Sequence, residues 1–87
     1  MSTKSLQELL REIEDVLRAG GPIKLDDREL LEQLRRDLHA VLDARPISGP
    51  RSVRDQLSEA MGRLQAEHPR LSGLLSATFD ALSDLGV

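Results

Sequence analysis

The chain has 87 residues, a length that corresponds to one domain near the lower end of the sizes that fold unaided. Its formal net charge of −3 argues against a general nucleic-acid-binding protein, and it has no cysteine for a disulfide or a thiolate metal site. The N-terminus lacks the pattern of a signal peptide, and no apolar run approaches the length of a membrane span, so we expect a cytoplasmic protein.

The first predicted helix covers residues 5–19, where apolar side chains recur every three or four positions and fall on one face. Ser5 and Glu8 have the spacing of a capping box, in which each side chain accepts a hydrogen bond from the backbone of the other residue. Two glycines and a proline at residues 20–22 end the helix. The apolar face consists of Leu6, Leu9, Leu10, Ile13, Val16 and Leu17.

The second predicted helix covers residues 26–44 and is expected to lie antiparallel to the first, because the link between them is short. Asp26 is the expected N-cap, with Glu29 as the reciprocal residue of a capping box. Leu25 and Leu30 are spaced as a hydrophobic staple around this cap. The apolar face consists of Leu30, Leu31, Leu34, Leu38, Val41 and Leu42.

Prolines, serine and glycine between residues 45 and 51 indicate a loop, after which Ser52 caps a third predicted helix over residues 52–67. Pro69 removes a backbone hydrogen bond and disfavours a helical conformation at the residue before it. We therefore expect either a break or a strong kink at this proline, followed by a fourth helix over residues 70–85.

No segment alternates in the manner of a β-strand, so the prediction is an all-α fold in a single domain of residues 1–87. It is an antiparallel helical hairpin followed by a third helix that is broken or kinked into a fourth, forming a small bundle.

The apolar residues of the fourth helix spread over about 200° of arc, which exceeds what three other segments are expected to cover. We therefore expect a non-enzymatic interaction module that self-associates, as a two-fold dimer in the simplest case, or that binds another protein. The predicted interface consists of Leu71, Leu74, Leu75, Phe79, Leu82 and Leu85.

Several stretches of the chain resemble a known family. They are the run Glu67-His68-Pro69-Arg70-Leu71, the pair Leu74-Leu75, the C-terminal run from Ala81 to Val87, and the acidic helix start from Leu25 to Leu31. Together they are similar to a family of short bacterial helical proteins classified as a domain of unknown function. The resemblance covers nearly the whole chain. It implies a bacterial, all-helical protein and brings no catalytic residue with it.

The two histidines are the first candidates for chemistry. His68 falls on the apolar side of the third predicted helix, where it could transfer a proton in a small enzyme, but a packed histidine at a helix boundary is the simpler interpretation. His39 lies on the flank of the second predicted helix and is expected to face solvent.

The acidic runs at residues 12–15 and 26–29 are expected to be solvated. No Glu-x-x-His pair, nucleophile elbow or phosphate loop occurs, so we expect no catalytic residue, cofactor or metal site.

Arg45, Arg51 and Arg54 form a local basic cluster at the second loop. Because arginine favours bidentate contacts with phosphate, these residues are a candidate anion-binding site. This is the alternative function: a small regulator that binds nucleic acid or a phosphorylated ligand. Against it, the segment offers no aromatic residue to stack a base and no helix-turn-helix pattern, so solvated loop arginines are the simpler interpretation.

Overall fold

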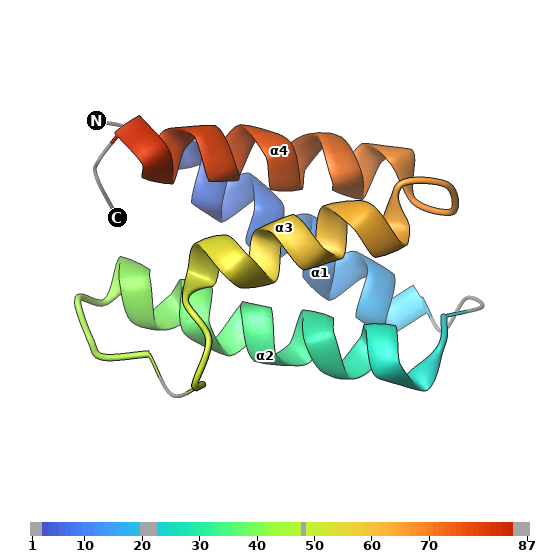
Figure 1. Cartoon of the computed structure of the whole chain (residues 1–87), viewed down its shortest axis with the longest axis horizontal. Helices are drawn as coiled ribbons and strands as arrows, with labels where there is room; N and C mark the ends of the chain where they lie inside the picture. Colours follow the sequence, from blue (N-terminus) through green and yellow to red (C-terminus); the bar gives the residue numbers. More distant parts are fainter. Residues whose placement is uncertain (1–2, 20–22, 48, 85–87) are drawn as a thin grey trace.

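Four helices follow one another along the chain and pack together as a bundle (Figure 1). They are α1 (Lys4–Ala19), α2 (Leu25–Leu42), α3 (Val53–Leu64) and α4 (Pro69–Asp84). The computed structural model describes residues 3–19, 23–47 and 49–84. None of these residues is in a β-strand, so the all-α prediction is confirmed, and each predicted helix matches one observed helix to within a few residues at each end.

Each helix packs against two of the other three. α1 contacts α2 and α4, and α3 likewise contacts α2 and α4, so the four helices form a closed ring around the core. Figure 1 shows α1 and α2 running in opposite directions, as predicted for the hairpin. The same view shows α3 between α4 and α2, with α1 behind it.

Pro69 breaks the helix instead of kinking it. α3 ends at Leu64, and α4 begins at Pro69 itself. A proline is well tolerated at the first position of a helix, because the N–H group that it lacks would have no partner inside the helix. His68, the residue before this proline, is hydrogen-bonded to both helices. Its N–H donates to the carbonyl of Leu64, the last residue of α3, at 2.8 Å, and its carbonyl accepts from the Ser72 N–H of α4 at 2.9 Å.

The helix starts confirm one predicted cap and correct two. The Ser52 hydroxyl accepts a hydrogen bond from the Asp55 N–H at 3.1 Å, so the predicted cap of α3 is confirmed. The Asp26 cap is wrong, because α2 already begins at Leu25, after an extended Lys24 whose carbonyl accepts from the Arg28 N–H. Leu25 is 68 % exposed and lies inside the helix, which is not the position of a staple residue before the cap.

The Ser5 cap is also wrong. α1 begins at Lys4, and the carbonyl of Thr3 accepts the first helical hydrogen bond, from the Gln7 N–H. In both helices the residue before the first helical one, Thr3 or Lys24, lies two residues before the predicted cap. At these two starts, the backbone follows the packing of the helix faces more closely than it follows the local capping pattern.

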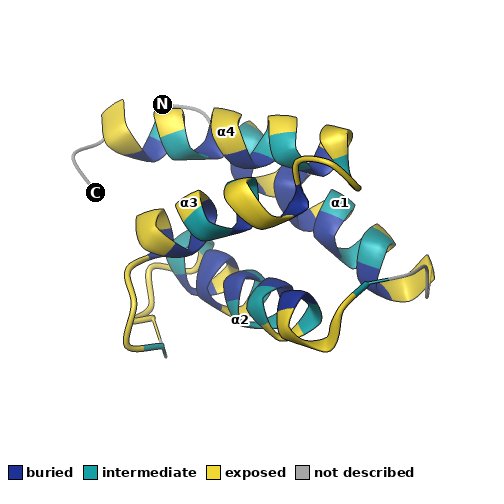
Figure 2. Cartoon of the chain, turned by 45° about the vertical axis from the view of Figure 1, so that its right-hand side comes forward, coloured by how far each residue is buried: buried dark blue, intermediate teal, exposed yellow. Residues whose placement is uncertain are grey.

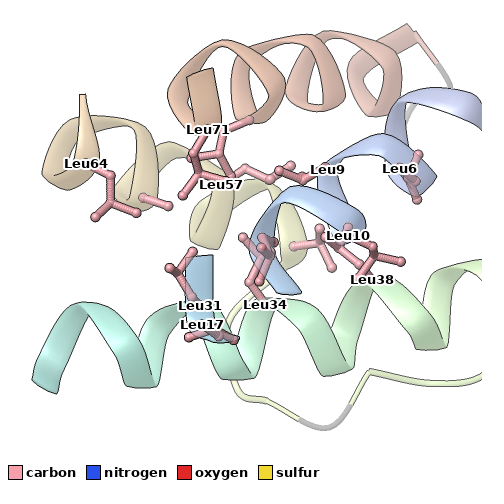
Figure 3. Close-up of a cluster of buried hydrophobic side chains, with 14 of the residues drawn as sticks. Leu6, Leu9, Leu10, Leu17, Leu31, Leu34, Leu38, Leu57, Leu64 and Leu71 are labelled. Carbon is pink, nitrogen blue, oxygen red and sulfur yellow. The ribbon is translucent and has the colours of Figure 1, made fainter. Parts of the chain in front are cut away.

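The core is built almost entirely of leucine. Leucines from all four helices converge between the helices, as the labelled side chains in Figure 3 show. Figure 2 shows the same arrangement by burial, with buried residues facing inward and exposed residues facing outward on each helix. The buried apolar residues of the cluster are Leu6, Leu9, Leu10, Ile13, Leu17, Leu31, Leu34, Leu38, Val53, Leu57, Ala60, Leu64, Leu71, Leu75 and Leu82.

This core corrects the interface predicted on the last helix. Leu71, Leu75 and Leu82 are at most 1 % exposed within one copy of the chain, so a second copy is not needed to cover them. The prediction was wrong at these positions because α4 packs against both α1 and α3, and its broad apolar face is therefore covered from two sides. Leu74 and Phe79 are half-buried against the core. Leu85 lies outside the described residues.

Candidate functional site

A groove of about 530 Å³ lies between α2, α3 and the loop that joins them. We call it the α2–α3 groove. Its volume is within the range of small-ligand and side-chain pockets. The residues that line it are Asp26, Glu29, Leu30, Glu32, Gln33, Arg36, Gly49, Pro50, Arg51, Gln56, Glu59 and Arg63.

A buried polar cluster lies beside this groove. Asp37 on α2 is fully buried, and its carboxylate accepts hydrogen bonds from two amide groups. The Gln33 Nε2 donates to Oδ1 at 3.1 Å, and the Gln56 Nε2 of α3 donates to Oδ2 at 2.6 Å. The hydrogen bond from Gln56 joins the two helices, so this cluster ties α2 to α3.

The loop before α3 packs closely against the same cluster. A Cβ atom added to Gly49 would lie 3.0 Å from the Gln33 Nε2 and 3.3 Å from the Asp37 Oδ2. A side chain at this position would therefore require Gln33 or Asp37 to shift by a few tenths of an ångström. The loop is also held by the Arg51 carbonyl, which accepts from the Gln56 Nε2 at 3.2 Å. The wall of the α2–α3 groove is therefore fixed by contacts between three segments of the chain.

Gln56 has one polar atom without a partner. Its side chain is 2 % exposed, and its Oε1 is buried with no hydrogen-bond donor among the described residues. The orientation of the amide is fixed, because the Nε2 already donates to both Asp37 and the Arg51 carbonyl. An unpaired buried acceptor costs about 1–3 kcal/mol. Gln56 is also one of the residues that line the α2–α3 groove.

Four charged side chains along the groove form a chain of ion pairs. Arg63 of α3 contacts Asp27 of α2 at 3.2 Å and Glu59 at 3.0 Å, and Arg51 contacts the same Glu59. The hydrogen bond to Asp27, followed by the charge of Glu59, raises the pKa of Arg63 above its ordinary value. Asp27 is only 8 % exposed, which corrects the prediction that the acidic run 26–29 is entirely solvated.

The other carboxylates that line the groove form no ion pairs within the described part of the chain. Glu29 and Glu32 form no ion pair with any described residue. In contrast, Arg36 donates to the Gln33 Oε1 at 2.8 Å, and the other two groove arginines are held by Glu59. The described groove residues without an ion-pair partner are therefore three carboxylates, those of Asp26, Glu29 and Glu32, and one guanidinium, that of Arg36.

The three predicted anion-binding arginines do not share one environment. Arg45 bonds the Asp43 carboxylate at 3.1 Å and lines a separate hollow near the C-terminal end of α2. Arg51 lines the α2–α3 groove, and the guanidinium carbon of Arg54 lies 5.1 Å from the centre of the Phe79 ring, a cation–π contact. Each of the three already has a partner within the chain.

The structure places the two histidines apart. His39 is exposed on α2, as predicted. His68 is half-buried at the start of α4, and its Nε2 is buried without a hydrogen-bond partner among the described residues. It lines a hollow of about 280 Å³ against α1, beside Glu12 and Asp15. Within residues 3–19, 23–47 and 49–84, no group of three or more metal-binding side chains is placed to hold an ion.

The buried polar residues have a signal in the sequence, because they lie at helical spacing from apolar core residues. Asp27 lies four residues before Leu31 and seven before Leu34, so it belongs to the apolar face of α2. Gln56 lies three residues after Val53 and four before Ala60, on the apolar face of α3. Polar residues at these positions are expected to be buried and paired.

The family comparison agrees with the resemblance noted in the sequence. Residues 6–87 match the model of the domain of unknown function DUF4404. Because this match covers nearly the whole chain, the protein belongs to that family. No curated protein and no solved structure gives a further match. None of the described helices combines the length and the apolar composition that crossing a membrane requires.

Proposed function

We propose that this member of the DUF4404 family is a non-enzymatic protein–protein interaction module and that its partner binds in the α2–α3 groove. The observation that carries the proposal is the buried Gln56 Oε1, an acceptor at the groove wall that no described residue of the chain satisfies. The charged groups around it support binding over catalysis. They are held in ion pairs with one another, which fixes a surface of defined charge.

The groove is also rigid where a partner would meet it. The Asp37 cluster joins α2 to α3, and the loop backbone at Gly49 packs against that cluster. A surface that is already held in its binding conformation loses little conformational entropy on association, which favours affinity. The proposal includes a cytoplasmic location in bacteria, which fractionation of cells that express the protein would test.

Self-association through α4 stays a prediction, and the proposed function does not need it. With Leu71, Leu75 and Leu82 in the core, the other residues of the predicted interface that the structure describes are Leu74 and Phe79. They lie on opposite edges of the helix face. Leu74 is beside α1, and Phe79 is covered by a guanidinium group from α3. Sedimentation equilibrium of the purified chain would decide between a dimer and a monomer.

The alternative function, binding of nucleic acid or a phosphorylated ligand, also stays a prediction. It would require Arg45, Arg51 and Arg54 to leave their partners within the chain. A gel shift with nucleic acid that weakens as salt rises would support it. The proposed function instead expects no shift in low salt.

Site-specific photo-crosslinking tests the proposed function. Benzoylphenylalanine is placed at Arg36, an exposed residue of the groove, or at Asp80 on the exposed face of α4 as the control position. In cells that express the protein, we expect the groove position to crosslink a defined protein that the control position does not. The purified pair should then re-form in solution. Identical adducts from both positions would contradict the proposal.

A further inference from the structure

We infer that the segment bound in the α2–α3 groove is cationic and presents an arginine side chain to Gln56 and to the carboxylates of the rim. This inference rests on the proposed function, because it states the chemistry of the partner for the same groove. It follows from three features of the groove: the unused acceptor at its wall, the unpaired carboxylates on its rim, and the arrangement of its own arginines.

The unused acceptor requires a donor. The Gln56 Oε1 can only accept a hydrogen bond, and the amide cannot be reversed without losing its bonds to Asp37 and the Arg51 carbonyl. A carboxylate or phosphate from a partner would have no hydrogen to offer. An ammonium or guanidinium group has several.

The rim carboxylates favour the same class of ligand. Glu29 and Glu32 are one turn apart on α2 and take part in no ion pair with the described residues. Asp26 adds a third carboxylate to this side of the groove, and its charge contributes to the raised pKa of Arg63. A cation at the rim therefore meets negative charge that the chain itself does not neutralise.

The arginines of the groove do not reverse this preference. Arg51 and Arg63 share Glu59, Arg63 also bonds Asp27, and Arg36 is hydrogen-bonded to Gln33. An anionic ligand would have to compete with carboxylates for Arg51 and Arg63, and only Arg36 has no carboxylate partner among the described residues. A cationic ligand needs no such exchange.

Arginine fits the groove better than lysine does. Its planar guanidinium group has five N–H donors in a fixed geometry, so one group can meet an amide oxygen and a carboxylate together. The apolar stem of the side chain can pack on Leu30 and Pro50, which also line the groove. We therefore expect an arginine-bearing protein segment and a weaker response to a lysine-bearing one.

Fluorescence anisotropy with labelled peptides tests this inference. The probes are (Gly-Arg)₄, (Gly-Lys)₄ and (Gly-Glu)₄ peptides of equal length. The groove variant carries Glu29→Gln and Glu32→Gln. The matched control carries Glu67→Gln and Asp80→Asn, two exposed carboxylates outside the groove. Both variants raise the net charge by the same amount, so an effect of overall charge would be equal in the two proteins. All four substituted positions lie outside the core, which protects the fold.

We expect the arginine peptide to bind most tightly and the groove variant to lose about tenfold in affinity, with the control variant losing less than about twofold. Equal losses in the two variants, preference for the glutamate peptide, or no binding of the arginine peptide would each overturn the inference. If crosslinking at residue 36 still captures a defined partner in these cases, the proposed function survives and only the cationic chemistry of its partner is wrong.

Discussion

The two sides of the bundle bury different kinds of side chain. Where α1 meets α4, the core is apolar except for Thr78, whose hydroxyl donates to the Ser5 carbonyl at 3.3 Å. Where α2 meets α3, the chain buries Asp27, Asp37 and Gln56. Apolar contacts tolerate many substitutions of similar volume, whereas each buried polar group needs a specific partner. The difference indicates that the first side provides stability and that the second also defines a site.

The largest expected change in the free energy of unfolding is on the apolar side of the bundle. Leu71→Ala removes a fully buried side chain and should lower the free energy of unfolding by about 2–5 kcal/mol, because it leaves a cavity among the leucines. Leu74→Ala on the same helix is the matched control, and its half-buried side chain should cost about 1 kcal/mol or less. Urea unfolding followed by circular dichroism measures both. Equal losses would mean that Leu71 is not part of the core.

On the polar side, Asp37→Ala should cost about 1–3 kcal/mol, because it leaves the amide groups of Gln33 and Gln56 without their acceptor. The control is Asp43→Ala, which removes an exposed partner of Arg45 and should cost less than about 1 kcal/mol. The same unfolding experiment compares them. If the two losses are equal, the buried cluster does not tie α2 to α3.

Substitutions of three glycines should change the free energy of unfolding least, and not all in the same direction. Gly49→Ala pushes a methyl group toward Gln33 and should destabilise the chain by about 1 kcal/mol. Gly62→Ala and Gly73→Ala meet open space on the exposed faces of α3 and α4, and each should stabilise by about 0.5–1 kcal/mol through helix propensity. Thermal unfolding reports both directions. A stabilising Gly49→Ala would contradict the close approach of the loop to the polar cluster.

Periodicity predicted the helices well because every core position in a bundle repeats at helical spacing. It could not show how much of the α4 face the other helices cover, since that depends on α4 lying between α1 and α3. This is why Leu71 was assigned to an interface and lies in the core. The predicted caps at Ser5 and Asp26 were wrong because a capping pattern is a local signal, and both helices begin before the predicted cap residue.

The groove could not be predicted from the sequence, for a related reason. Asp37 and Gln56 are 19 residues apart, and only the packing of α2 on α3 brings their side chains together. Each lies at helical spacing from buried apolar residues, which was a sign of burial, but no pattern identified them as partners of one another. The basic residues were visible as a cluster in the sequence, yet Arg51 in the loop before α3 pairs with Glu59, whereas Arg54 on α3 lies over Phe79.

The most direct test of the account is an NMR titration of the ¹⁵N-labelled chain with the (Gly-Arg)₄ peptide. We expect the largest shifts at the side-chain amide of Gln56 and at backbone groups of α2 and α3 along the groove, with little change at Leu74 and Phe79 of α4. Shifts centred on α4, or spread evenly over all four helices, would contradict the claim that recognition takes place in the α2–α3 groove.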